Sequence, residues 1–79
     1  MVTVLRVGGL RVVIYLDDHE PAHVHVLGDG EAKIDLGIAS GEPELVWARG
    51  FSNADLRRAY RLVRDNRDVL IASWRKYHG

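Results

Sequence analysis

Three of the four histidines stand within seven positions, in the run Asp18-His19-Glu20-Pro21-Ala22-His23-Val24-His25-Val26. Imidazole has an unperturbed pKa of about 6.5, so it can transfer protons, bind metal ions or hold phosphate groups near neutral pH. On a strand, side chains two positions apart share one face and lie roughly 7 Å apart. The run is therefore the first candidate for a functional site.

Three kinds of chemistry suit this run. In acid–base cleavage of RNA, one imidazole of His19, His23 or His25 takes a proton from the 2′-hydroxyl and another protonates the leaving oxygen. In a metal site, His23 and His25 supply two ligands and His19 or Glu20 the third. In plain recognition, the histidines hydrogen-bond a partner chain. We take the first, with catalytic His19, His23 and His25 and no metal or cofactor, as the leading hypothesis.

Alternating apolar residues and turn residues predict the strands that must position these histidines. The pair Gly8-Gly9 suits the positive φ angles of a two-residue hairpin turn. Gly28-Asp29-Gly30 breaks a second hairpin in the same way. The predicted strands are 2–7, 10–16, 23–27, 31–36 and a short one at 45–47. In the second strand, Leu16 is expected on the apolar face.

A helical pattern follows from about Asn53, after Ser52 as a helix-capping residue. Its apolar stripe consists of Leu56, Tyr60, Val63, Leu70, Trp74 and Tyr77. Arg67 interrupts this stripe, which predicts a kink or two helices. Trp47 and Trp74 are expected in the core, and His78 in a frayed end.

These elements predict an α+β fold in a single domain, 1–79, with a β-rich part at 1–48 and a helical part at 52–78. A mainly antiparallel sheet of four or five strands is covered on one face by a long C-terminal helix, kinked or straight, or by two shorter helices. Val24 and Val26 then face the helix, so His23 and His25 lie on the open face. Arg11, Tyr15 and Lys33 are expected to join them there as substrate-binding residues.

Composition narrows the classes of protein. The chain has no cysteine, which excludes disulfides and thiolate metal sites. No apolar run approaches the roughly 18 residues that span a bilayer, and no signal-peptide pattern opens the chain, so we expect a cytoplasmic protein. Residues 1–48 carry three basic and eight acidic side chains, and residues 49–79 the reverse. The basic part suits an anionic partner, and the small core admits a homo-oligomer.

The motif His19-Glu20-Pro21-Ala22-His23-Val24-His25-Val26 resembles that of the small bacterial proteins grouped as domain of unknown function family 4160. Members typically read His-x-Pro-Pro-His-Val-His-Val, so Ala22 replaces the second proline here. The similarity extends to Thr3-Val4-Leu5-Arg6, Glu31-Ala32-Lys33, Glu44-Leu45, Arg49-Gly50-Phe51-Ser52 and Trp74-Arg75-Lys76-Tyr77.

The resemblance implies the toxin of a two-gene toxin–antitoxin module, neutralised by a small cognate antitoxin protein. Carried over with it are His19, Pro21, His23 and His25 as motif residues. We therefore expect a type II toxin whose histidine-bearing face is the active or target-binding site, with RNA cleavage as the first mechanistic hypothesis. The alternative is a non-catalytic module that binds protein or nucleic acid.

Overall fold

Five strands and two helices make up the protein in a computed structural model that describes residues 1–79. They are β1 (Val2–Val7), β2 (Leu10–Ile14), β3 (His23–Leu27), β4 (Glu31–Asp35), β5 (Glu44–Arg49), α1 (Asn53–Asp65) and α2 (Arg67–His78). The sheet order is β1-β2-β3-β4-β5, and every neighbouring pair is antiparallel. The predicted α+β class is confirmed, with five strands and two helices.

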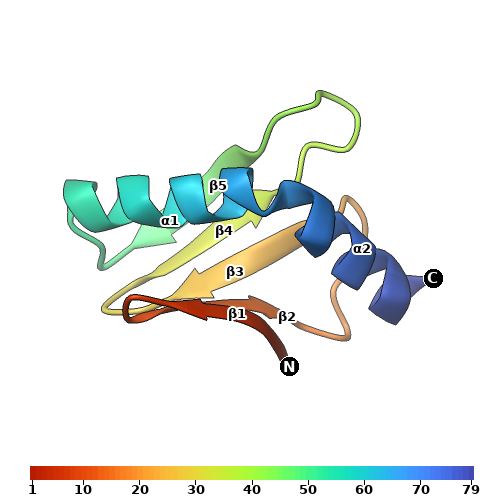
Figure 1. Ribbon diagram of the computed structural model, residues 1–79, viewed down its shortest axis with the longest axis horizontal. Helices are drawn as coiled ribbons and strands as arrows, with labels where there is room; N and C mark the ends of the chain where they lie inside the picture. Colours follow the sequence, from red (N-terminus) through yellow and green to blue (C-terminus); the bar gives the residue numbers. More distant parts are fainter.

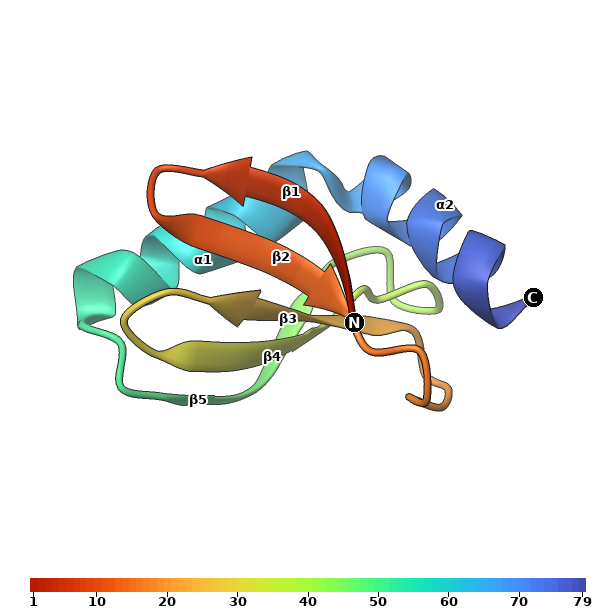
Figure 2. The same ribbon diagram turned by 90° about the horizontal axis from the view of Figure 1, so that it is seen from below.

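Both helices lie against the same face of the sheet, with α1 beside β4 and β5 and α2 beyond the end of the strands (Figures 1 and 2). The alternation of the strands decides which residues face them. Val24 and Val26 of β3 are fully buried in the core, as predicted. The core is completed by residues from every layer: Leu10, Val12, Ile14, Ala22, Ala32, Ile34, Leu36, Ala59, Val63, Leu70 and Trp74. No helix is long and apolar enough to cross a bilayer.

The first hairpin turns at Gly8 and Gly9, with φ of 53° and 81°. Positive φ at both positions is what a type I′ turn requires, and glycine adopts it without steric cost. The second strand is shorter than predicted, because the chain turns after Tyr15, whose carbonyl accepts a hydrogen bond from the Asp18 amide at 3.1 Å. Leu16 is therefore not on the apolar face of a strand and is 54% exposed.

The helical segment is two helices that meet at Asn66. The first begins as predicted: the Ser52 hydroxyl accepts a hydrogen bond from the Asp55 amide at 3.1 Å. Arg67 opens the second helix, and its guanidinium donates to the carbonyl oxygens of Leu36 and Gly37, at 2.7 Å each. Arg67 therefore interrupts the apolar stripe for a structural reason: it supplies hydrogen-bond donors to the two carbonyl groups that follow β4.

Two predictions about aromatic residues near the helices are wrong. Trp74 is in the core, but Trp47 is 36% exposed, because β5 lies at the edge of the sheet and all six of its residues are exposed. His78 belongs to α2 rather than to a frayed end. Its ring stacks on Trp74 with centroids 3.8 Å apart.

Candidate functional site

The two strand histidines lie opposite the helix-covered face but are not open to solvent. His23 and His25 alternate with the core valines of β3, and His25 is paired with Val13 on one side and Lys33 on the other. Only 4% of His23 and 8% of His25 is exposed. The prediction of an open histidine surface is wrong, because side chains from the β2–β3 loop, β5 and α2 pack over the imidazoles.

Aromatic rings form that cover. The ring of Tyr15 meets the edge of the His25 ring at 4.7 Å between centroids, and Trp47 lies 5.9 Å from it on the other side. The His23 ring lies 5.4 Å from that of His25 and 5.2 Å from that of Trp74. Both imidazoles are thus fixed in orientation by rings from three parts of the chain.

Hydrogen bonds fix which ring nitrogens carry protons. Nδ1 of His23 lies 2.9 Å from the carbonyl oxygen of Pro21, and Nδ1 of His25 lies 3.1 Å from Oε2 of Glu31. A carbonyl or carboxylate oxygen only accepts, so each Nδ1 donates. In the neutral ring, Nε2 then has a free lone pair.

Both Nε2 atoms face the same carboxylate. Oδ2 of Asp18 lies 2.9 Å from Nε2 of His23 and 3.7 Å from Nε2 of His25. The shorter separation is within ion-pair range, yet the direction is wrong for a hydrogen bond, and Oδ2 is buried with no hydrogen-bond partner. The oxygen and the two nitrogens therefore lie close together without a hydrogen bond from either nitrogen to the oxygen. These three residues are called the Asp18 cluster below.

Burial lowers the pKa of His25, and this effect exceeds the opposing influence of its hydrogen bond to Glu31 and of the Asp18 charge. The charged imidazolium loses hydration in such surroundings, which favours the neutral ring. At neutral pH the Nε2 lone pair of His25 is therefore available.

The predicted site residues have different places in the fold. Tyr15 contacts His25, and Lys33 is its cross-strand neighbour. Arg11 lies two pairs further along the sheet on the same face, opposite Leu27. His19 is exposed in the β2–β3 loop, and no hydrogen bond, ion pair or ring contact joins it to the other histidines.

Sequence reasoning missed two members of the site, Asp18 and Glu31. Glu31 was detectable, because it lies across a hairpin from Leu27 and on the same face as His25. Its other oxygen pairs with Arg49 at 3.2 Å. Asp18 had no periodic signal, since a loop rather than a strand brings it over the imidazoles.

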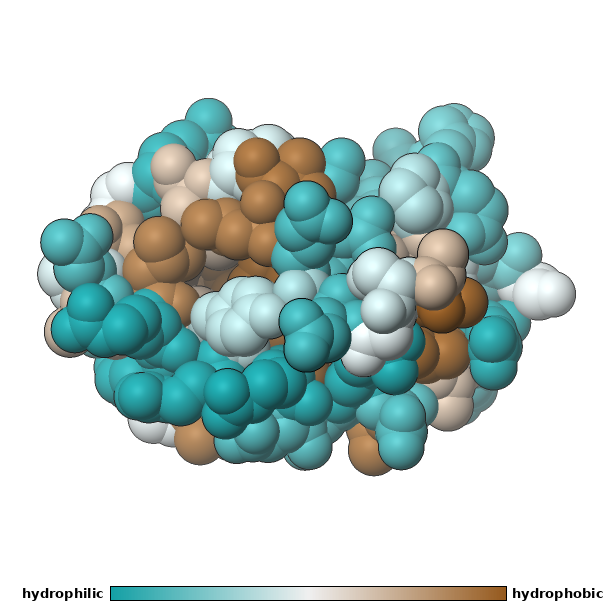
Figure 3. Space-filling view, turned by 90° about the horizontal axis from the view of Figure 1, so that it is seen from above, coloured by the Kyte–Doolittle hydropathy of each residue, from teal (hydrophilic) through white to brown (hydrophobic).

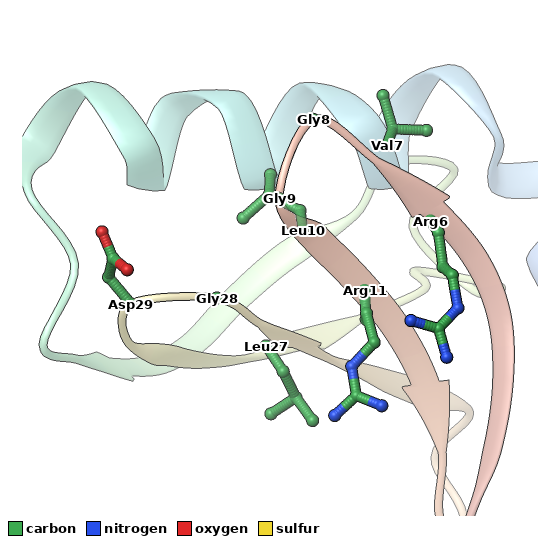
Figure 4. Close-up of a pocket in the computed structure, with 9 residues that line it drawn as sticks. All are labelled: Arg6, Val7, Gly8, Gly9, Leu10, Arg11, Leu27, Gly28 and Asp29. Carbon is green, nitrogen blue, oxygen red and sulfur yellow. The ribbon is translucent and has the colours of Figure 1, made fainter.

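Basic side chains extend from the Asp18 cluster across the same face. Arg6 and Arg11 are cross-strand partners that line a pocket formed by residues 6–11 and 27–29. Figure 4 shows their guanidinium groups side by side, with Asp29 at the other end of this pocket. No carboxylate lies within ion-pair distance of Arg6, Arg11 or Lys33. Like charges directly opposite each other destabilise a sheet, so this pair suits an anionic ligand.

Comparisons with known proteins give one match. No curated protein and no solved structure matches the chain. The family described as "Domain of unknown function (DUF4160)" matches residues 9–75, which include the Asp18 cluster, the unpaired Arg11 and Lys33, and most of both helices. With so much of its length matched, the chain belongs to the DUF4160 family.

Proposed function

We propose that the protein is the toxin of a type II toxin–antitoxin module and that it acts on RNA at the face that bears the Asp18 cluster. The observation that carries this proposal is the set of unpaired cations next to buried imidazoles on one face of the sheet. Phosphate groups supply most of the binding energy for basic nucleic-acid-binding surfaces. Arg6, Arg11 and Lys33 are placed to bind them without first breaking an internal ion pair.

Aromatic side chains beside these cations support a nucleic acid over a small anion. Trp47 lies across from Lys33 in the next strand and is partly exposed, with the Arg49 guanidinium 5.2 Å from its ring centre. Stacking of bases on exposed aromatic rings is the usual means of binding single-stranded RNA. A strand laid across β2 to β5 would thus contact arginine, lysine and tryptophan in turn.

The chemistry falls to the Nε2 atoms, because each Nδ1 is already a donor within the protein. Neutral His25 takes the proton from the 2′-hydroxyl at its Nε2 lone pair, and His23 acts in its doubly protonated form, giving its Nε2 proton to the leaving oxygen. Asp18 Oδ2 faces both Nε2 atoms, so a ribose reaches these nitrogens only when the Asp18 side chain, which is 24% exposed, moves aside. An imidazole pair next to cations that hold the phosphate is the arrangement that cleavage at a 2′-hydroxyl needs.

An antitoxin would bind at the edge strand β5. Its residues are all exposed, and an unpaired strand edge offers backbone groups to an incoming strand. Between β5 and α1 runs an apolar groove lined by Leu45, Leu56 and Tyr60 and bordered by Arg57 and Arg61. Figure 3 shows a hydrophobic patch on this side of the molecule, bordered by hydrophilic side chains. The complementary partner is an extended segment with apolar and acidic residues.

The test is growth on induced expression. We expect the wild-type chain to arrest growth and His23→Ala and His25→Ala to be harmless while they remain soluble. The matched control is His19→Ala, in the same loop and strand region but outside the cluster, which should stay toxic. Co-expression of the adjacent small gene should restore growth. Equal toxicity of all four proteins, or none in the wild type, would refute the proposal.

A second candidate is a non-catalytic RNA-binding module, favoured by the burial of both imidazoles. Purified protein would then bind single-stranded RNA with a steep salt dependence and leave it intact. The toxin proposal instead requires that the RNA is cleaved and that His25→Ala abolishes cleavage without abolishing binding.

A further inference from the structure

We infer that the Asp18 cluster is a binding site for one divalent transition-metal ion, with Zn²⁺ as the ion of choice. The ligands are Nε2 of His23, Nε2 of His25 and Oδ2 of Asp18, which all lie within 4.8 Å of one another. The inference goes beyond the toxin proposal, and its test is separate because metal binding is measured without any RNA or cell. With an ion bound, Nε2 of His23 and Nε2 of His25 serve as ligands and not as the acid and base of the proposed RNA cleavage.

Both oxygen–nitrogen separations fit a shared ion, and the two nitrogens lie within 4.8 Å of each other. A tetrahedral ion with bonds of about 2.0–2.1 Å holds its ligand atoms about 3.3 Å apart. The oxygen of Asp18 lies 2.9 Å and 3.7 Å from the two nitrogens, on either side of that value. Only shifts of a few tenths of an ångström at each oxygen–nitrogen pair are needed to bring both to the ideal distance.

The direction of the contact between Asp18 and His23 distinguishes two ligands of a shared metal ion from a hydrogen-bonded ion pair. In a hydrogen-bonded ion pair the oxygen lies on the axis of the N–H bond. When a metal lies on that axis, the second ligand lies to one side of it. At 2.9 Å the oxygen is close enough for a hydrogen bond but lies off the axis, and it has no hydrogen-bond partner. The geometry therefore fits an ion between the atoms.

Partners behind the ligands have the form that metal sites use. A metal-bound imidazole usually donates its other nitrogen to a carbonyl or carboxylate, which fixes the tautomer and the ring orientation. His23 donates to the carbonyl of Pro21 and His25 to the carboxylate of Glu31. Both rings thus leave Nε2, the nitrogen next to Asp18, free to bind an ion.

The ligand types select the metal. Two imidazoles and one carboxylate suit Zn²⁺ and its neighbours Co²⁺, Fe²⁺ and Ni²⁺, and not Mg²⁺ or Ca²⁺, which prefer oxygen ligands. Three protein ligands leave a coordination position for water, which is typical of catalytic rather than structural zinc sites.

The experiment uses the full chain after treatment with a chelator, titrated with Zn²⁺ and with Co²⁺. We expect one ion per chain by calorimetry and elemental analysis, and a Co²⁺ absorption spectrum of the intense, low-symmetry type given by four-coordinate sites. Zn²⁺ at about 100 times its Kd should raise Tm by roughly 10 °C or more. Mg²⁺ should do none of these.

Variants locate the site. Asp18→Asn and His25→Gln should lower Zn²⁺ affinity at least 100-fold, and Glu31→Gln by about 10- to 100-fold through its effect on His25. Asp17→Asn and His19→Gln are the matched controls, next to the cluster but exposed, and should bind as the wild type does.

A further measurement on the wild-type chain does not depend on whether the variants fold. Nuclear magnetic resonance of the imidazole nitrogens should show that Zn²⁺ shifts Nε2 of His23 and His25 and leaves His19 and His78 unchanged. Shifts confined to His19 or His78, a stoichiometry other than one, or no binding at all would overturn the inference. So would wild-type affinity in folded Asp18→Asn.

Discussion

Replacing Arg67 with methionine should strongly destabilise the protein, because its guanidinium donates to two carbonyl oxygens at 2.7 Å each. Leu36 and Gly37, which carry those oxygens, are buried, so water cannot replace the donor. A hydrogen bond to a charged group contributes about 1.5–3 kcal/mol. Since Arg67 itself is only partly buried, the lower value applies, and losing both bonds should cost about 3 kcal/mol.

That loss is large for a chain of this size, whose total stability is about 4–12 kcal/mol at 0.05–0.15 kcal/mol per residue. Each kcal/mol shifts Tm by about 4–8 °C in a domain of 60–100 residues, so Tm should fall by roughly 12 °C or more. Methionine retains the packing of the side-chain stem. Urea unfolding followed by tryptophan fluorescence, to which buried Trp74 and partly exposed Trp47 both contribute, measures the change.

Arg64→Met is the matched control three positions earlier. Arg64 is exposed and pairs only with Asp65, so its loss should change the unfolding free energy by about 0.5 kcal/mol or less. Arg67→Lys should fall between, because one ammonium group cannot reproduce the two-pronged geometry. Equal midpoints for Arg67→Met and Arg64→Met would refute the argument that Arg67 joins α2 to the sheet.

Three further outcomes follow from single contacts. Ser52→Ala removes the side-chain acceptor for the Asp55 amide and should cost about 1 kcal/mol in urea unfolding, whereas no loss would mean that solvent caps α1 equally well. Gly37→Ala should lower Tm, because φ is 67° there and a Cβ atom would collide with the Glu42 carbonyl; an unchanged Tm would contradict the tight turn. Arg11→Gln should weaken RNA binding and reduce the slope of log K against log salt by about one, and an unchanged slope would exclude Arg11 from phosphate contact.

The sequence predicted the elements that depend on periodicity. The valines of β3 alternate with histidines, and this alternation correctly separated the core face from the histidine face. Gly8-Gly9 and Ser52 were found because each meets a local backbone requirement. Such signals depend on near neighbours along the chain, so they can be read without the fold.

The cover of the histidines could not be predicted in the same way. It depends on the positions of Asp18, in a loop, and Trp74, in the last helix, relative to His23. No pattern of neighbouring residues in the sequence predicts that either side chain packs over the imidazoles. Trp74 follows the apolar stripe of its helix and lies in the core, whereas Trp47 lies in a strand whose residues are all exposed. The place of β5 at the edge of the sheet, which no local pattern gives, decides the exposure of Trp47.

That strand order has a consequence for how the protein folds. Each strand pairs with the next one along the chain, so the sheet grows by closing short loops, which is fast and entropically inexpensive. The hydrogen bond from Trp74 Nε1 to Glu20 instead joins residues 54 positions apart in the sequence, and the same tryptophan packs on His23. The sheet can therefore form early and bring Tyr15 and Trp47 to His25, while His23 acquires its final environment only when the last helix docks. On this order of events, His23 is the last part of the Asp18 cluster to be covered.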